Sequence, residues 1–140
     1  MLVGYDQSGF VKGRNILDGA LIANETVDYL KQKRIKSLIF KVDFEKAFDS
    51  LSWEFLMEVM EFMGFGEKWR RWILTCLKSA SISVLVNGSS TNEFTLDRGV
   101  RQGDPLSPFL FIIAAEGLNA LAKRAVSCNM FSGVEIGREK

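Results

Sequence analysis

The 140-residue sequence contains no histidine. This absence removes the side chain that acts as general base beside a catalytic serine or cysteine, and it removes a common zinc ligand. Only two cysteines are present, Cys76 and Cys128, which are too few for a disulfide framework, and no signal-peptide pattern begins the chain. We therefore expect reduced thiols in an intracellular protein whose chemistry relies on carboxylates, lysines and arginines.

Long apolar runs and an excess of charge are missing as well. The longest apolar run, residues 108–115, is far shorter than the roughly 20 residues of a membrane-spanning helix, so we expect it in a core and expect no membrane partner. The net charge is +1, whereas a dedicated nucleic-acid binder usually shows a clear basic excess. Basic residues do cluster locally, although a solvated helix face is the simpler interpretation of the first two clusters. These clusters are Lys31, Lys33, Arg34 and Lys36; Lys68, Arg70 and Arg71; and Arg98 and Arg101.

Apolar residues make up 47% of the chain, enough for one domain with a sizeable core. Helical spacing of these residues predicts four helices: one from Ile16, one after Ser52, one that includes Trp69 to Leu77, and one from Ser107. Ser52 is a predicted N-cap and Gly64 a predicted helix end, while Ser107 is predicted to cap the last helix. The tryptophan and methionine stripes on these helices are interpreted as packing. Those stripes comprise Trp53, Met57, Met60, Met63, Trp69 and Trp72.

Alternating apolar residues predict a short strand over 38–43, with Asp43 at its end and facing away from the apolar side. A second strand over 81–86 leads to Asn87-Gly88, a dipeptide typical of tight hairpin turns, and then to a return strand that includes Phe94 and Leu96. Residues 133–137 are a further candidate strand. The order of these elements predicts an α+β domain with a mainly antiparallel sheet.

Two segments carry groups suited to chemistry. In residues 43–49, a carboxylate follows an apolar strand directly, an arrangement suited to Mg²⁺, although a solvated turn is the simpler interpretation. In residues 98–108, glycines permit close backbone approach, two arginines can hold phosphates, and a helix begins near Pro108. An ordinary connector is the simpler interpretation of this second segment, and the spacing of a P-loop is absent.

Three segments together resemble the reverse transcriptase of non-LTR (LINE-type) retrotransposons, particularly those of plants. They are DQSGFVKGRNILDGALIANE, FKVDFEKAFDSLSWEFL and RGVRQGDPLSPFLFIIAAEGLN, in this order, and the resemblance extends from Asp6 to Glu135. It implies an α+β fold comprising incomplete fingers and palm, with an antiparallel palm sheet packed on helices. Residues 1–36 would be a fingers-side segment and helix, and residues 37–140 an incomplete palm.

The resemblance also implies roles for individual residues. Asp43 corresponds to the catalytic aspartate that binds both Mg²⁺ ions, and Phe44 would offer its backbone carbonyl to the second ion. Phe48 matches the aromatic that crowds the sugar 2′ position, where the hydroxyl distinguishes RNA from DNA precursors. Gln102 and Gly103 would line the incoming nucleotide and template. Possible nucleic-acid contacts are Arg14, Arg98 and Arg101; Asp49 belongs to the motif but is not expected to bind metal.

A two-metal polymerase needs several converging carboxylates, because the two ions lie only about 4 Å apart. The family supplies the others from a hairpin with an aromatic-Ala-Asp-Asp motif, and this sequence contains no Asp-Asp pair. We therefore expect a partial domain that is inactive alone and poorly soluble or marginally stable. The family implies an RNA template, a DNA primer, deoxynucleotides and a nuclear location. One alternative is a non-catalytic remnant that binds RNA or protein. Another is a phosphate-binding hydrolase, for which the sequence offers no general base.

Overall fold

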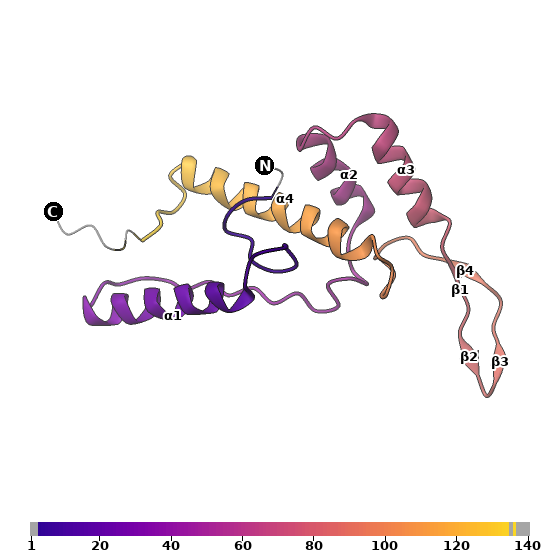
Figure 1. Cartoon of the computed structure of the whole chain (residues 1–140), viewed down its shortest axis with the longest axis horizontal. Coiled ribbons are helices and arrows are strands. Elements are labelled where there is room, and N and C mark those ends of the chain that lie inside the picture. Colours follow the sequence, from indigo (N-terminus) through magenta and orange to yellow (C-terminus); the bar gives the residue numbers. More distant parts are fainter. Residues whose placement is uncertain (1–2, 135, 137–140) are drawn as a thin grey trace. The chain divides into compact units, whose positions relative to one another are not determined.

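The computed structural model describes residues 3–134 and 136 (Figure 1). Its helices are α1 (Ile16–Gln32), α2 (Trp53–Phe62), α3 (Glu67–Lys78) and α4 (Ser107–Ser127). Its strands are β1 (Ser81–Ile82), β2 (Leu85–Val86), β3 (Ser89–Ser90) and β4 (Phe94–Thr95). The predicted α+β class is confirmed, but helices predominate and the strands form two small antiparallel pairs. Backbone contacts divide the chain into a first unit, residues 3–43 and those from Glu116 onward, and a second unit, Phe44–Ala115.

Helix α2 has the ends that its sequence predicts. The Ser52 hydroxyl accepts a hydrogen bond from the Phe55 amide at 3.3 Å, which satisfies one amide of the first turn. At the other end Gly64 adopts a φ of +83°, and the Phe65 amide donates to the Met60 carbonyl at 2.9 Å. This geometry turns the chain sharply toward α3 because glycine enters the left-handed region without a steric cost.

The core of the second unit lies between α2, α3 and the start of α4. Leu56 and Met60 of α2 are completely enclosed, and Ile73 of α3 packs in the same cluster. The prediction that the α3 tryptophans belong to this core is wrong, because Trp69 and Trp72 are 47% and 54% exposed. The whole core cluster comprises Leu51, Leu56, Met60, Ile73, Val100, Leu110 and Ala114.

The four strands form one hairpin after α3. Strand β1 pairs with β4, placing Ile82 opposite Phe94, and β2 pairs with β3, placing Val86 opposite Ser89. The predicted turn is confirmed, since Asn87 and Gly88 have φ values of 51° and 84°. Positive φ at both positions is the geometry of a two-residue turn that matches the right-handed twist of its strands.

The predicted strand over residues 38–43 is wrong. This segment is irregular, and Leu38 and Phe40 are 91% and 85% exposed. A strand forms only when its amides and carbonyls bond to a neighbouring strand, and no described residue offers this segment such a ladder. Alternation alone therefore does not fix the conformation. The candidate strand at 133–137 includes residues outside the described ones.

Helices α1 and α4 have the predicted positions, with differences in detail. In α1 the Asn15 side chain accepts from the Leu17 amide at 3.1 Å, but of the predicted apolar face only Leu30 is buried. In α4 the prediction that Ser107 caps the helix is wrong. The Asp104 carboxylate accepts from the Leu106 amide at 2.8 Å. None of the helices within residues 3–134 is both long and apolar enough to cross a membrane.

Candidate active site

The two segments singled out by sequence are joined by backbone hydrogen bonds inside the second unit. The Val100 amide donates to the Phe48 carbonyl at 2.7 Å, and the Gly99 amide donates to the Leu51 carbonyl at 2.8 Å. The buried Trp53 indole donates to the Gly99 carbonyl at 2.6 Å. We call these three hydrogen bonds, between residues 48–53 and 99–100, the clasp. It fixes the spacing of the two segments, because separating them would leave buried backbone groups unpaired and would destabilise the fold.

Gly99 makes the clasp possible. Its φ is +81°, and a Cβ placed on it would lie 2.5 Å from the carbonyl oxygen of Asp49. Any other residue would be both strained and in collision with backbone. The close approach that sequence reasoning reserved for a ligand is therefore used by the protein's own chain. Gly103 also has a positive φ, +87°, but a Cβ there would have open space around it.

Gln102 lies beside the clasp and contacts Asp49. Its side-chain amide Nε2 donates to Asp49 Oδ1 at 3.4 Å, and both side chains are exposed. The Asp49 carboxylate, which the sequence analysis left out of the metal ligands, is thus directed at Gln102. Ser107 stabilises the loop that contains Gln102, because its buried hydroxyl donates to the Arg101 carbonyl at 2.5 Å.

Three phenylalanine rings meet in the second unit. The ring of Phe48 stacks on that of Phe111 with centroids 5.2 Å apart, and Phe44 meets Phe111 edge-on at 6.4 Å. Phe111 comes from the first turns of α4 and orients the aromatic ring that the resemblance assigns to sugar selection. Sequence reasoning interpreted Phe111 only as part of an apolar run.

Asp43 is the last residue of the first unit's N-terminal part. It lies in the irregular segment that replaces the predicted strand, and its side chain is exposed. Two Mg²⁺ ions need a cluster of carboxylates. Within the described part of the chain, no three His, Cys, Asp or Glu side chains gather closely enough to hold a metal ion. The described residues therefore do not by themselves fit the two-metal site of a polymerase.

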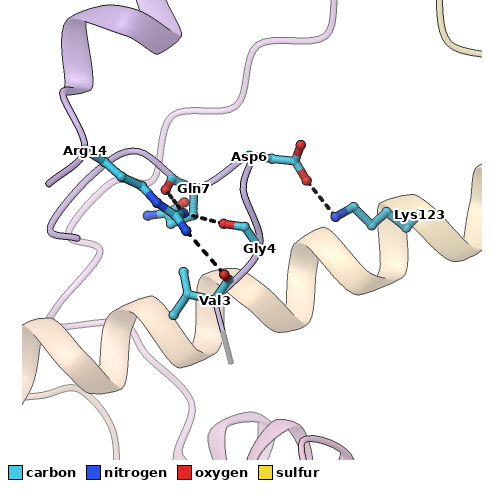
Figure 2. Close-up of polar contacts among 6 residues, drawn as sticks. All are labelled: Val3, Gly4, Asp6, Gln7, Arg14 and Lys123. Atoms are coloured by element: carbon cyan, nitrogen blue, oxygen red, sulfur yellow. Dashed lines mark hydrogen bonds and ion pairs between the residues drawn. The ribbon is translucent and has the colours of Figure 1, made fainter. Parts of the chain in front are cut away.

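Arg14 lies in the loop over residues 3–14, and its guanidinium faces the loop's own backbone (Figure 2). It donates to the carbonyl oxygens of Gly4, Gln7 and Val3, the last two at 2.5 Å and 3.5 Å. The position predicted to touch nucleic acid is therefore engaged within the protein.

The other two predicted arginines lie at the surface of the second unit. Arg98 Nε contacts Asp97 Oδ1 at 3.3 Å, and this hydrogen bond holds the pKa of the Asp97 carboxyl below its usual value. Arg101 is exposed beside Gln102 in the sequence. Both remain accessible to a phosphate, since a surface ion pair of this kind is weak and screened by salt.

Sequence reasoning did not identify the contacts of three residues that shape this region, Trp53, Gly99 and Phe111. A tryptophan directly after a predicted helix cap, and a glycine within a motif, both suggest a local structural role. Their partners, however, lie about 50 residues away along the chain, as in the Trp53–Gly99 hydrogen bond with a separation of 46. A pattern within a few residues cannot predict a contact over that sequence separation.

Comparison with known proteins places these features in a family. The family profile described as "Reverse transcriptase (RNA-dependent DNA polymerase)" matches residues 1–132. The chain is 30% identical over 122 residues to the transposon TX1 uncharacterized 149 kDa protein of Xenopus laevis, covering 87% of this chain and 9% of that protein.

Two further relatives match shorter stretches. A retrovirus-related Pol polyprotein from the type-1 retrotransposable element R2 of Popillia japonica is 34% identical over 93 residues, covering 64% of this chain and 15% of the polyprotein. An uncharacterized mitochondrial protein of Arabidopsis thaliana is 42% identical over 52 residues, covering 37% of this chain and 43% of that protein. The chain thus spans only a small part of the two animal proteins.

Proposed function

Because the chain belongs to the reverse transcriptase (RNA-dependent DNA polymerase) family, we propose that it is part of the RNA-directed DNA polymerase of a non-LTR retrotransposon. The similarity to the R2 and TX1 proteins supports that element type. The similarity to an Arabidopsis protein supports a plant-like origin. The substrates would be an RNA template, a DNA primer and deoxynucleotides, with residues 1–36 on the fingers side and 37–140 in the palm.

The clasp is the observation that carries this proposal. It joins the segment bearing Phe48 to the segment bearing Gln102 through hydrogen bonds of 2.7 and 2.8 Å. A polymerase must select the sugar and the base of one nucleotide at the same moment, so the groups that do so need a fixed spacing. Phe48 would exclude the ribose 2′ hydroxyl, while Gln102 and Gly103 would contact the nucleotide and template.

Asp43 is the residue to which we assign metal binding, with the backbone carbonyl of Phe44 as a further oxygen donor. Mg²⁺, when bound, neutralises charge on the transferred phosphate. Because the described residues do not complete such a site, we propose that carboxylates other than those in the described residues complete it. We therefore expect no primer extension by this chain alone.

A segment exchange tests the assignment. In the R2 polyprotein of Popillia japonica, the matched segment is replaced by the corresponding residues of this chain, and extension of a primer on an RNA template is measured with Mg²⁺. We expect extension that is abolished by Asp43→Ala and retained by Asp28→Ala, because Asp28 is an exposed acid of α1. We also expect Phe48→Ala to raise incorporation of ribonucleotides relative to deoxynucleotides.

Two results would contradict the proposal. One is extension at the parent rate by the Asp43→Ala exchange protein, which would show that this carboxylate is dispensable. The other is a folded exchange protein that binds template and primer but extends nothing. Both measurements use the same protein preparation, and circular dichroism confirms the fold.

A non-catalytic RNA-binding role is a second candidate, favoured by the surface of α3. Trp69 and Trp72 are about half exposed, their rings meet edge-on at 6.1 Å, and the Lys68 amine lies 5.1 Å from the Trp72 ring. Exposed aromatic rings beside cations suit the bases and phosphates of a single strand. This role predicts salt-dependent RNA binding by the chain that is weakened by Trp72→Ala and unaffected by Asp43→Ala.

A further inference from the structure

The loop over residues 3–14 is anchored to both helices of the first unit. The Lys123 amine of α4 contacts Asp6 Oδ2 at 2.6 Å (Figure 2). A Cβ placed on Gly4 would lie 3.3 Å from the Asn119 side chain, so the loop backbone lies close against α4. A Cβ on Gly19 of α1 would lie 3.1 Å from the Ser8 hydroxyl. The loop is therefore held against α4 near its start and against α1 near its middle.

Arg14 folds the loop from inside. Its guanidinium reaches the carbonyl oxygens of three loop residues, Gly4, Gln7 and Val3, and its own amide donates to the Val11 carbonyl at 3.1 Å. Several parallel donors in one rigid plane are a property of arginine that lysine does not share. The side chain therefore acts as a cross-link between distant points of the same loop.

The loop presents two aromatic rings and a cation to solvent. Tyr5 is 85% exposed with the Arg14 guanidinium 5.8 Å from its ring centre, and Phe10 is 66% exposed. Phe10 has a φ of +58°, a conformation that costs a bulky residue energy and persists only when the surroundings impose it. Lys12 is exposed, whereas the loop's acid, Asp6, is neutralised by Lys123.

We propose that Arg14 is a positioning residue whose guanidinium holds the 3–14 loop in the shape that presents Tyr5, Phe10 and Lys12 to a single-stranded RNA. The rings stack on bases and the amine contacts a phosphate, while Arg14 acts through the loop backbone. Exposed aromatic rings with a neighbouring cation are the composition that single-stranded nucleic acids recognise. This inference rests on the proposed function, since the family implies an RNA template, and it changes the role expected for Arg14.

The test uses the full 140-residue chain and a fluorescent oligouridylate RNA, with affinity measured over a range of salt concentrations. Arg14→Lys keeps the charge and loses the planar set of donors, so it separates the two possible roles. We expect Arg14→Lys and Arg14→Ala to weaken binding equally, by about tenfold, and to accelerate amide hydrogen exchange in residues 4–13. Tyr5→Ala and Phe10→Ala each weaken binding by about fivefold or more because a base no longer stacks on the ring, whereas Tyr5→Phe and Phe10→Tyr retain it.

The salt dependence gives an independent readout. The slope of log affinity against log salt falls by about 0.7 for each phosphate of a single strand that the protein no longer neutralises. We expect that decrease for Lys12→Ala and no larger decrease for Arg14→Lys, which keeps its own charge. Hydrogen exchange in α2 and α3 checks that every variant is folded.

Rescue of binding by Arg14→Lys, or unchanged exchange in the loop of Arg14→Ala, would overturn the positioning role. Absence of measurable binding by the unaltered chain would overturn the RNA-binding role of the loop. None of these readouts involves DNA synthesis. Failure of the segment exchange to extend a primer would therefore count against the polymerase proposal only. The RNA-binding and hydrogen-exchange measurements would still decide the role of the loop.

Discussion

Gly99 is a residue whose importance comes from its missing side chain. It sits where the backbone of the 98–104 loop meets the Asp49 carbonyl, and its own amide and carbonyl both take part in the clasp. Trp53 covers it from α2 with a buried indole. The spacing between the proposed sugar-selecting and base-contacting groups therefore depends on the absence of one methyl group.

We predict that Gly99→Ala destabilises the second unit by about 2–5 kcal/mol. The left-handed conformation costs an alanine about 1–2 kcal/mol, and overpacking against fixed backbone adds about 1–3 kcal/mol. Amide hydrogen exchange in α2 and α3 measures the change as a loss of protection. Gly103→Ala is the matched control, because its φ is similarly positive but its Cβ has open space. It should cost about 1–2 kcal/mol, and equal losses for the two variants would contradict the steric argument.

At the scale of elements, the sequence predicts helices better than strands. The ends of α2 follow from Ser52 and Gly64, whose effects lie within one turn of the chain. The hairpin turn follows from Asn87-Gly88 for the same reason. Residues 38–43 have the alternation of a strand, yet their conformation depends on a distant partner strand that no local pattern specifies.

The candidate site shows the same division. The motifs at 43–49 and 98–108 are visible in the sequence, and Gly99 and Gly103 of the second motif have positive φ. Their joining through Val100 and Phe48, and the support of Phe48 by Phe111, depend on contacts between segments far apart in the chain. The direction of the Arg14 side chain, toward its own loop, is equally invisible in a motif.

The attachment of the 3–14 loop to α4 should depend on pH. A hydrogen bond with Lys123 holds the pKa of the Asp6 carboxyl below its usual value of 3.8, and the same bond raises the pKa of Lys123 above 10.5. A lowered acid pKa means that the stabilisation is complete above the usual value and is lost as pH falls through the lowered one. A raised lysine pKa means that it is complete below 10.5 and is lost as pH rises further.

We therefore expect hydrogen exchange in residues 4–13, corrected for its intrinsic pH dependence, to show full protection from about pH 4 to about pH 10. Protection decreases outside that window. The effect is small, because both side chains are mostly exposed and salt screens the pair. Asp6→Asn should remove the acid-side decrease and leave the loop less protected near neutral pH. An acid-side decrease of the same size in Asp6→Asn would contradict this assignment.

On the scale of the whole molecule, the chain exposes an unusual number of large apolar side chains. They occur in α1, where Leu17 and Ile22 are 67% and 66% exposed, in the irregular segment at Leu38 and Phe40, and on α3. Exposed apolar surface of this extent marks surfaces that other protein normally covers, or a tendency to aggregate. The remainder of a polymerase domain is the cover that the family suggests.

We predict that the chain alone binds a hydrophobic dye such as ANS. On heating, it should unfold gradually and with a low midpoint, without a sharp transition. Replacing Leu38 and Phe40 by serine should reduce dye binding and aggregation with no loss of helix content, because these side chains are 91% and 85% exposed. Leu56→Ser is the contrasting variant and should lose helix content, since Leu56 is completely enclosed. A monodisperse sample with a sharp, cooperative thermal transition would contradict this prediction.

The clasp also has a topological consequence. The Gly99 amide donates to the Leu51 carbonyl, so the two ends of the segment between these residues, which includes α2, α3 and the hairpin, are held together. The length of this segment can change without altering the spacing of the two motifs, because lengthening a segment with joined ends costs little entropy. The exposed turn at Asn87-Gly88 is thus a suitable place to insert a reporter peptide or domain. Insertions and deletions among related sequences should be tolerated at this turn and should be absent from residues 99–103.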